Sequence, residues 1–137
     1  MLAEITLDQI YLPAAPSIDG LTFRLFRDET DYQFVVDLGN ASSAADGVED
    51  YVTFEWAVNY FSHLTGFDPR RDVLFAEMNG QPVATTRVWP RLLDDGARLY
   101  MFAGSMLPQW RRRGIGRALL HWAEGRLREI AATQPSA

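Results

Sequence analysis

The residues best suited to chemistry form one basic turn near the end of the chain, RRRGIGR at residues 111–117. An apolar-periodic segment follows, so the turn is expected to open a helix. The first N–H groups of a helix have no intrahelical partner, and the helix dipole gives them partial positive charge. Gly114 and Gly116 have no Cβ, which lets a phosphate approach the backbone. The turn predicts an anion site, and a pyrophosphate suits it better than a carboxylate because it engages several N–H groups.

Three other interpretations of this turn are open. The two glycines alone would shape a tight turn, with the arginines as a solvated patch. A dinucleotide-binding turn needs a third small residue where Leu119 stands and an acid about 20 residues later, and the chain offers neither. A nucleic-acid patch disagrees with Glu124 and Glu129 on the other face of the helix and with a net charge of -5.

Composition indicates one folded domain, because the 137 residues are 47% hydrophobic and 12% aromatic. All 13 basic residues are arginine, which excludes a lysine-dependent phosphate loop, and the lack of cysteine excludes thiol nucleophiles and disulfides. Histidines and carboxylates lack metal-ligand spacing, so we expect no metal. The acidic balance argues against nucleic-acid partners. No signal peptide or apolar stretch of about 18 residues is present, which predicts a cytoplasmic protein without membrane association.

The first half of the chain predicts one strand and two helices. Residues 21–27 alternate apolar and polar side chains, as a strand does. Asp28 is the expected N-cap of a first helix, which should end near Gly39 because the small polar residues 39–47 favour a loop. Asp46 or Asp50 would begin the second helix. Its apolar stripe is Val48, Val52, Trp56, Tyr60 and Leu64.

The centre of the chain predicts a β-hairpin. Residues 73–78 are apolar enough for a buried strand. Asn79 and Gly80 tolerate the positive φ angles of a type I′ turn, so the chain should reverse there. Residues 82–89 would form the returning strand, with Pro90 as its end.

The last predicted elements are a strand over residues 97–107 and a helix over residues 116–132. Gly104, inside the strand, suggests a bulge or a close approach of two backbones. We therefore expect a mixed α/β (α+β) fold with a mostly antiparallel sheet and flanking helices. Residues 1–20 are expected to be an N-terminal arm and residues 21–137 the domain. The core face of the helix is predicted as Ile115, Leu119, Trp122, Ala123, Leu127 and Ile130.

The segment LPQWRRRGIGRALL resembles the signature of the GNAT acyltransferase superfamily. That signature is a strand ending near a proline, an aromatic residue, and Arg/Gln-x-x-Gly-x-Gly/Ala opening a helix. Pro108, Trp110, Arg111, Gly114 and Gly116 match it in order. The predicted elements from the first strand to the last helix also follow the order of that fold.

The resemblance implies an acyl-CoA-dependent N-acyltransferase that takes acetyl-CoA as cosubstrate and attacks the thioester directly with a small-molecule or peptide amine. It implies that the turn binds the pyrophosphate and that the backbone of the preceding strand binds the pantetheine arm. The implied pyrophosphate residues are Arg111, Arg112, Arg113, Gly114, Ile115, Gly116 and Arg117. The implied pantetheine residues are Gly104, Met106 and Leu107.

Two residues are candidates for proton transfer in the cleft. Glu77 would serve as the base for the substrate ammonium, and Tyr100 is a second candidate. Each has a plainer interpretation: Glu77 lies next to a hairpin turn where a solvated glutamate is common, and Tyr100 would pack against the sheet.

The resemblance covers residues 21–133, roughly the first two-thirds of a full GNAT domain, because that fold continues with a further strand, helix and hairpin. The last sheet strand is therefore expected to have an open edge. Three explanations are a truncated piece of a longer protein, a second chain that supplies the strand, or a partly built fold. We expect truncation, and next a homodimer through the open edge. The alternative function is a non-catalytic CoA-binding or protein-interaction module.

Overall fold

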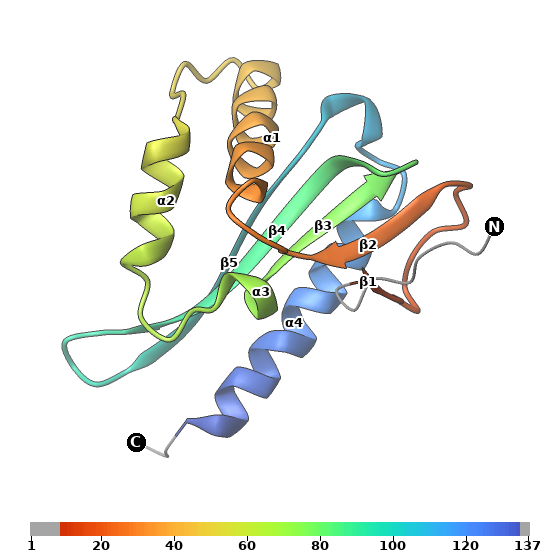
Figure 1. Ribbon diagram of the computed structural model, residues 1–137. Helices are drawn as coiled ribbons and strands as arrows, with labels where there is room; N and C mark the ends of the chain where they lie inside the picture. The colour runs from red at the N-terminus through yellow and green to blue at the C-terminus, as the bar shows by residue number, and fades with distance from the viewer. Residues whose placement is uncertain (1–8, 135–137) are drawn as a thin grey trace.

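The computed structural model describes residues 9–134, which form a five-stranded antiparallel sheet with helices on both faces (Figure 1). The strands follow each other across the sheet in chain order, β1-β2-β3-β4-β5. The strands are β1 Gln9–Ile10, β2 Leu21–Leu25, β3 Val73–Met78, β4 Gln81–Leu92 and β5 Arg98–Met106. The helices are α1 Asp31–Ala45, α2 Phe54–Ser62, α3 Pro69–Asp72 and α4 Ile115–Thr133, with a 3-10 turn η1 at Pro108–Trp110. This architecture confirms the predicted fold class.

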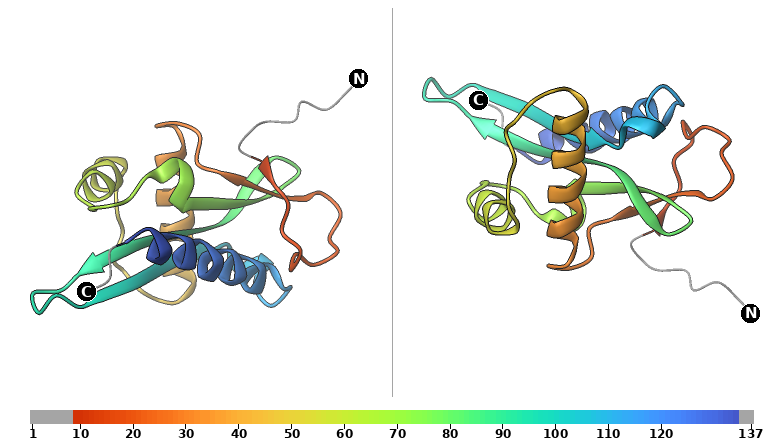
Figure 2. Two further views of the ribbon diagram at one scale, coloured as in Figure 1. Left: turned by 90° about the horizontal axis from the view of Figure 1, so that it is seen from below. Right: turned by 90° about the horizontal axis from the view of Figure 1, so that it is seen from above.

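The two faces of the sheet bury separate apolar clusters. Figure 2 shows α4 on one face of the sheet and α1 and α2 on the other. Side chains alternate along β3, so Leu74 and Ala76 pack toward α4 with Ile115, whereas Val73 and Phe75 pack in the cluster of α1 and α2. Within residues 9–134, no helix is long and apolar enough to cross a membrane.

The central hairpin forms as predicted, but its second strand is longer. Asn79 and Gly80 have φ angles of 49° and 82°, as a type I′ turn requires. Pro90 does not end the strand, because β4 continues to Leu92. The pairing of β3 with β4 stops at Arg87, so beyond it β4 is paired with β5 alone. A proline is tolerated where a strand has only one neighbour.

Helix α1 starts and ends later than predicted. Its N-cap residue is Thr30 instead of Asp28, and it continues to Ala45 through the segment expected to be a loop. Tertiary contacts hold the added turns. The side chain of Asn40 donates to the carbonyl of Val52 at 3.0 Å and accepts from its N–H at 2.9 Å.

Helix α2 also starts later than predicted, at Phe54. Thr53 is its N-cap, and the hydroxyl of Thr53 accepts from the N–H of Trp56 at 3.1 Å. The predicted stripe is displaced by one position, because Ala57 and Phe61 are buried whereas Trp56 is 39% exposed. The start expected at Asp46 or Asp50 is therefore wrong: Asp46 is the C-cap of α1, and the residue that caps α2 is Thr53.

The segment before β2 joins the fold at three places. Strand β1 pairs antiparallel with β2, with Ile10 opposite Phe23. Leu12 is buried in the cluster under α4. Pro16 then lies beside Gly114, at the start of α4. Through Pro16, the N-terminal segment thus lies against the start of α4.

Candidate functional site

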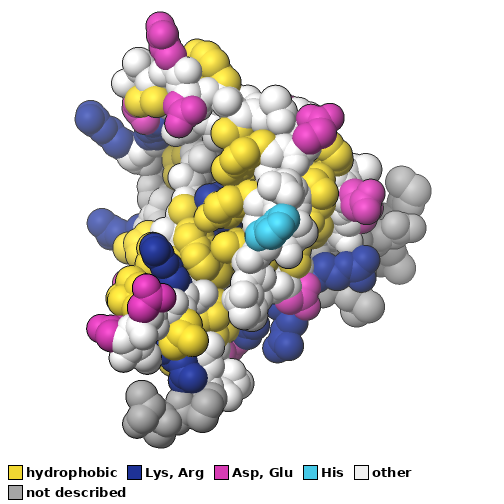
Figure 3. Space-filling model, turned by 90° about the vertical axis from the view of Figure 1, so that its left-hand side faces the viewer, with side chains coloured by type: hydrophobic (Ala, Val, Ile, Leu, Met, Phe, Trp, Pro, Cys, Tyr) yellow, Lys and Arg dark blue, Asp and Glu magenta, His cyan; other side chains and the backbone are white. Residues whose placement is uncertain are grey.

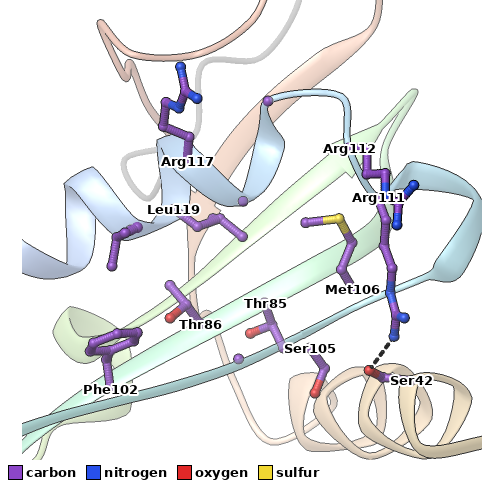
Figure 4. A pocket seen from close by; sticks show the side chains of 14 residues that line it. Ser42, Thr85, Thr86, Phe102, Ser105, Met106, Arg111, Arg112, Arg117 and Leu119 are labelled. Carbon is purple, nitrogen blue, oxygen red and sulfur yellow. Dashed lines mark hydrogen bonds between the residues drawn. The ribbon is translucent and has the colours of Figure 1, made fainter. Parts of the chain in front are cut away.

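A groove of about 600 Å³ runs along β5 and the beginning of α4. It continues across the adjoining part of β4 and ends at the C-terminal part of α1. Figure 4 shows its side chains, with Met106 and Leu119 pointing into the space between β5 and α4 and Phe102 at the end away from the basic turn. The lining residues are Ser42, Thr85, Thr86, Phe102, Gly104, Ser105, Met106, Arg111, Arg112, Gly114, Gly116, Arg117, Leu119 and Leu120.

Strand β5 has one open edge, because it is the last strand of the described sheet. Neighbouring residues of an antiparallel strand direct their backbone N–H and C=O groups to opposite sides. The N–H of Leu107 donates to the carbonyl of Val83 on β4 at 2.9 Å. Met106 and Gly104 are one and three residues before it, so their backbone groups face the open edge.

The backbone groups of Leu107 do not face the open edge. Its N–H is bonded to Val83, and its carbonyl accepts from the N–H of Trp110 at 3.0 Å. Leu107 is also absent from the groove lining. Of the three pantetheine residues that the resemblance implied, the structure therefore brings Gly104 and Met106 to the groove and leaves Leu107 in the turn that follows.

At Gly104, β4 and β5 leave no room for a side chain. A Cβ built there would lie 2.5 Å from the carbonyl oxygen of Thr85 and 3.3 Å from the Cα of Thr86. The register of β4 and β5 is regular across it, with Gly104 opposite Thr86. Of the two predicted explanations for Gly104, the structure therefore shows the close backbone approach and no bulge. A register shift does occur between β3 and β4, at Ala76 and Glu77.

The basic turn carries two left-handed residues before α4 begins. Arg112 has a φ of 64° and Gly114 a φ of 91°. Gly114 is the N-cap of α4, and no side chain of the described residues caps the helix start. Its first N–H groups are therefore available to an anion at the end of the groove, where Gly116 also lies.

The arginines of the turn have different surroundings. Arg111 reaches the C-terminal end of α1, where it donates to the hydroxyl of Ser42 at 3.0 Å (Figure 4). It also donates to both carboxylate oxygens of Asp46, the residue after the helix, at 2.8 and 3.3 Å. The hydrogen bond from Arg111, helped by its charge, lowers the pKa of Asp46. Arg113 lies over the ring of Trp110 at 5.0 Å. Arg111 therefore connects the turn to α1 rather than standing free for a ligand.

Three further residues of the turn contribute in distinct ways. The side chain of Ile115 is fully buried under the sheet, so only its backbone can reach a ligand. Arg112 and Arg117 are exposed and line the groove. Their guanidinium groups can add positive charge to the helix start, and Figure 4 shows Arg117 turned away from the strands.

Glu77 does not face the groove. It is 8% exposed and accepts from Nε of Arg24 at 2.9 Å, on the sheet face that α1 covers. Arg24 also donates to both carboxylate oxygens of Asp31 at 2.9 Å, so it links β3, β2 and the start of α1. This buried network accounts for Glu77 as a structural residue, and the sequence concealed it because Arg24 is 53 positions away.

Tyr100 also lies outside the groove lining. It is 37% exposed, and its hydroxyl donates to Gln134 at 2.9 Å beyond the end of α4. Within residues 9–134, no group of three or more His, Asp or Glu is arranged to hold a metal ion.

The sequence model of the acetyltransferase (GNAT) family matches residues 25–134 of the chain. The chain belongs to the GNAT family. No curated protein matches it at a significant level. The match confirms the resemblance drawn from the signature around Gly114.

Solved GNAT structures share the fold. A GCN5-related N-acetyltransferase from Sphaerobacter thermophilus is 21% identical, with a TM-score of 0.70 over 86% of this chain and 35% of its own. YncA, a putative acetyltransferase from Salmonella typhimurium solved with acetyl-CoA, is 21% identical, with a TM-score of 0.64 over 82% of this chain and 66% of its own. A Brucella melitensis GNAT acetyltransferase in complex with acetyl-CoA is 23% identical, with a TM-score of 0.58 over 80% of this chain and 69% of its own. The chain thus spans about a third of the first protein and just under two thirds of the second.

Proposed function

We propose that the groove is the acetyl-CoA site of an N-acetyltransferase, which moves an acetyl group to a small-molecule or peptide amine. The observation that carries the proposal is the union of an open strand edge with an uncapped helix start in one groove. Acetyl-CoA in the Salmonella and Brucella relatives supports the choice of ligand.

The ligand's parts suit different ends of the groove. The diphosphate would lie against the first N–H groups of α4, where Gly114 and Gly116 leave the backbone uncovered and Arg112 and Arg117 add charge. The amide groups of the pantetheine arm would bond to the outward backbone of β5. Apolar contacts from Met106 would complete the wall.

The proposed reaction is a direct acyl transfer. The acceptor ammonium first loses a proton, and its nitrogen then attacks the thioester carbon. The new N–C bond forms while the C–S bond breaks, and the departing thiolate takes up the second proton, which the nitrogen must lose to become an amide. An outward N–H of β5 near Gly104 would stabilise the negative charge that develops on the carbonyl oxygen.

One observation favours the second candidate, a CoA-binding module without catalysis. The groove lining contains no Asp, Glu, His or Tyr among the described residues. A proton acceptor must lie within hydrogen-bond reach of the amine, directly or through one water. Because Glu77 is paired with Arg24 and Tyr100 lies outside, the described groove has no side chain suited to that task.

Calorimetric titration of acetyl-CoA tests the binding site. Gly114→Glu places a side chain and a negative charge at the helix start, and we expect it to abolish binding. Gly125→Glu is the matched control, because it adds the same charge on the same helix at a place with open space around it. Arg117→Glu reverses a charge on an exposed residue of the groove, so it tests the site without crowding Pro16. Equal affinity of all four proteins would refute the site.

An assay of acetyl transfer separates the two functions. Release of free CoA thiol is followed with a panel of amines, and each product is verified by mass spectrometry. Transfer to any amine supports the enzyme. Tight binding of acetyl-CoA with no transfer to any of them supports the module.

We also propose that the open edge of β5 associates with a second copy of the chain, since unpaired edges favour strand addition. The same edge would hold acetyl-CoA, so the two events should compete. Sedimentation velocity should detect a dimer that dissociates as acetyl-CoA is added. A monomer at every protein concentration would contradict this association.

A further inference from the structure

Arg87 lies on β4, on the sheet face covered by α1 and α2. It is opposite Val73 of β3 and Ala103 of β5, at the last residue of β4 that pairs with β3. Val73 packs in the cluster of that face, and Arg87 shares its orientation because paired residues point to the same side. A half-buried arginine thus stands under α2.

The guanidinium of Arg87 is surrounded by aromatic rings. Its Cζ lies 5.3 Å from the ring centre of Tyr60, 5.6 Å from that of Phe61 and 5.4 Å from that of Trp89. Its Nε is buried and has no hydrogen-bond partner in the described part of the chain. The residue as a whole is only half-buried.

Other arginines of the fold are satisfied differently. Arg24, Arg111 and Arg126 each bond to at least one carboxylate at 2.8 or 2.9 Å. Taking a cation out of water without an anionic partner is costly, and aromatic faces offset only part of that cost. A carboxylate bound to Arg87 would supply the missing charge and a bidentate partner for its donors.

Arg87 also stands between two strand residues that share its sheet face and line hollows on either side of it. Thr85, two residues before it, lines the groove, and Trp89, two residues after it, lines a second hollow of about 470 Å³ with Tyr60 and Met101. Two strand residues span about 7 Å, so a small molecule over Arg87 would reach both. Figure 3 shows hydrophobic side chains gathered across the side of the molecule that carries α2.

We propose that Arg87 binds the carboxylate of the acceptor, so that the substrate is an amine that also carries a carboxylate. The apolar body of the acceptor occupies the hollow beside Trp89, and its amine points toward the groove at Thr85. This inference rests on the proposed acetyl transfer, but carboxylate binding can be measured without it.

The intrinsic fluorescence of the chain gives a direct binding test, because Trp89 adjoins the guanidinium. Phenylacetate is titrated as the carboxylate probe and phenylacetamide as its neutral match, without acetyl-CoA. We expect saturable binding of phenylacetate, with affinity at least tenfold weaker for phenylacetamide and for the Arg87→Gln variant. Arg128→Gln removes the same charge from an exposed site on α4 and should bind as the unaltered chain does.

Circular dichroism melting verifies that Arg87→Gln is folded, and Arg87→Lys, which keeps the charge without the planar fork, should bind phenylacetate with intermediate affinity. Equal affinity for the two probes, or for the unaltered chain and Arg87→Gln, would overturn the inference. So would the absence of saturable phenylacetate binding to a chain that binds acetyl-CoA by calorimetry.

Transfer kinetics then connect the site to the reaction. Amino acids should exceed their amides at least tenfold in kcat/KM, and Arg87→Gln should remove that preference while its affinity for acetyl-CoA is unchanged. An undiminished preference in Arg87→Gln would contradict the assignment. If acetyl transfer is absent altogether, the fluorescence titration still decides whether Arg87 binds a carboxylate.

Discussion

Replacing Gly104 with alanine should force β4 and β5 apart. The new Cβ would meet the carbonyl oxygen of Thr85 at 2.5 Å, whereas carbon–oxygen contacts between strands ordinarily measure about 3.3–3.6 Å. The strands must separate locally by about 1 Å, because the atoms in the way belong to the backbone and no side-chain rotation can relieve the contact. Overpacking of this kind costs about 1–3 kcal/mol.

Urea unfolding followed by circular dichroism measures the effect. Gly104→Ala should lower the free energy of unfolding by about 1–3 kcal/mol. The matched control is Gly125→Ala, where an added Cβ meets nothing within 4 Å and lies inside α4. This control should raise stability by about 0.5–1 kcal/mol, because glycine is the poorer helix former.

Comparing the unfolding of Gly104→Ala with that of Gly125→Ala tests the close approach of the two strands. If Gly104→Ala unfolds at the same urea concentration as the unaltered chain, the close approach of β4 and β5 does not exist as described. If both variants are destabilised equally, the effect belongs to alanine in general. We also expect Gly104→Ala to bind acetyl-CoA more weakly, since the outward backbone of β5 moves with the strand.

Three further predictions concern side chains. Arg24→Met should lower the free energy of unfolding by about 3–5 kcal/mol, because it leaves two buried carboxylates without their cation; a cost below about 1 kcal/mol, measured by urea unfolding, would disprove the network. Arg111 lowers the pKa of Asp46 in the folded state, so their pair stabilises the fold above the unfolded pKa of about 4 and loses its effect as the pH falls through the folded value. The unfolding midpoints of the unaltered chain and Asp46→Asn should thus differ at pH 7 and converge in strong acid. Tyr100→Phe removes one exposed hydrogen bond and should change stability by less than about 1 kcal/mol, with acetyl transfer unaffected; a tenfold loss of kcat would contradict its position outside the groove.

Local chemistry made much of the fold predictable. Asn79 and Gly80 require positive φ angles wherever they form a two-residue turn, so the hairpin follows from two residues. The last helix follows from a repeating apolar pattern, and Ile115, Leu119 and Ala123 are buried as expected. Gly104 in the middle of a predicted strand also indicated a close approach of two backbones, because glycine is the one residue without a Cβ.

Long-range contacts explain where local reasoning failed. Residues 39–45 look like a loop because they are small and polar, but Asn40 and the link between Arg111 and Asp46 hold them in α1. The part of the site built by Arg87 was missed for a related reason. Three aromatic residues enclose it only after β4 and α2 come together, and an isolated arginine in a strand carries no local sign of that.

The contact of Pro16 with Gly114 determines how this protein can be shortened. The family match begins at residue 25, so a recombinant domain cut at that boundary would lose β1, the buried Leu12, Pro16 beside the helix start and all of β2 except Leu25. Such a version would keep all of the GNAT signature yet lose the residue that packs beside Gly114 in its glycine turn. Expression tags and fusion partners are therefore best attached ahead of this segment, which lies outside the recognisable family sequence and adjoins the proposed acetyl-CoA site.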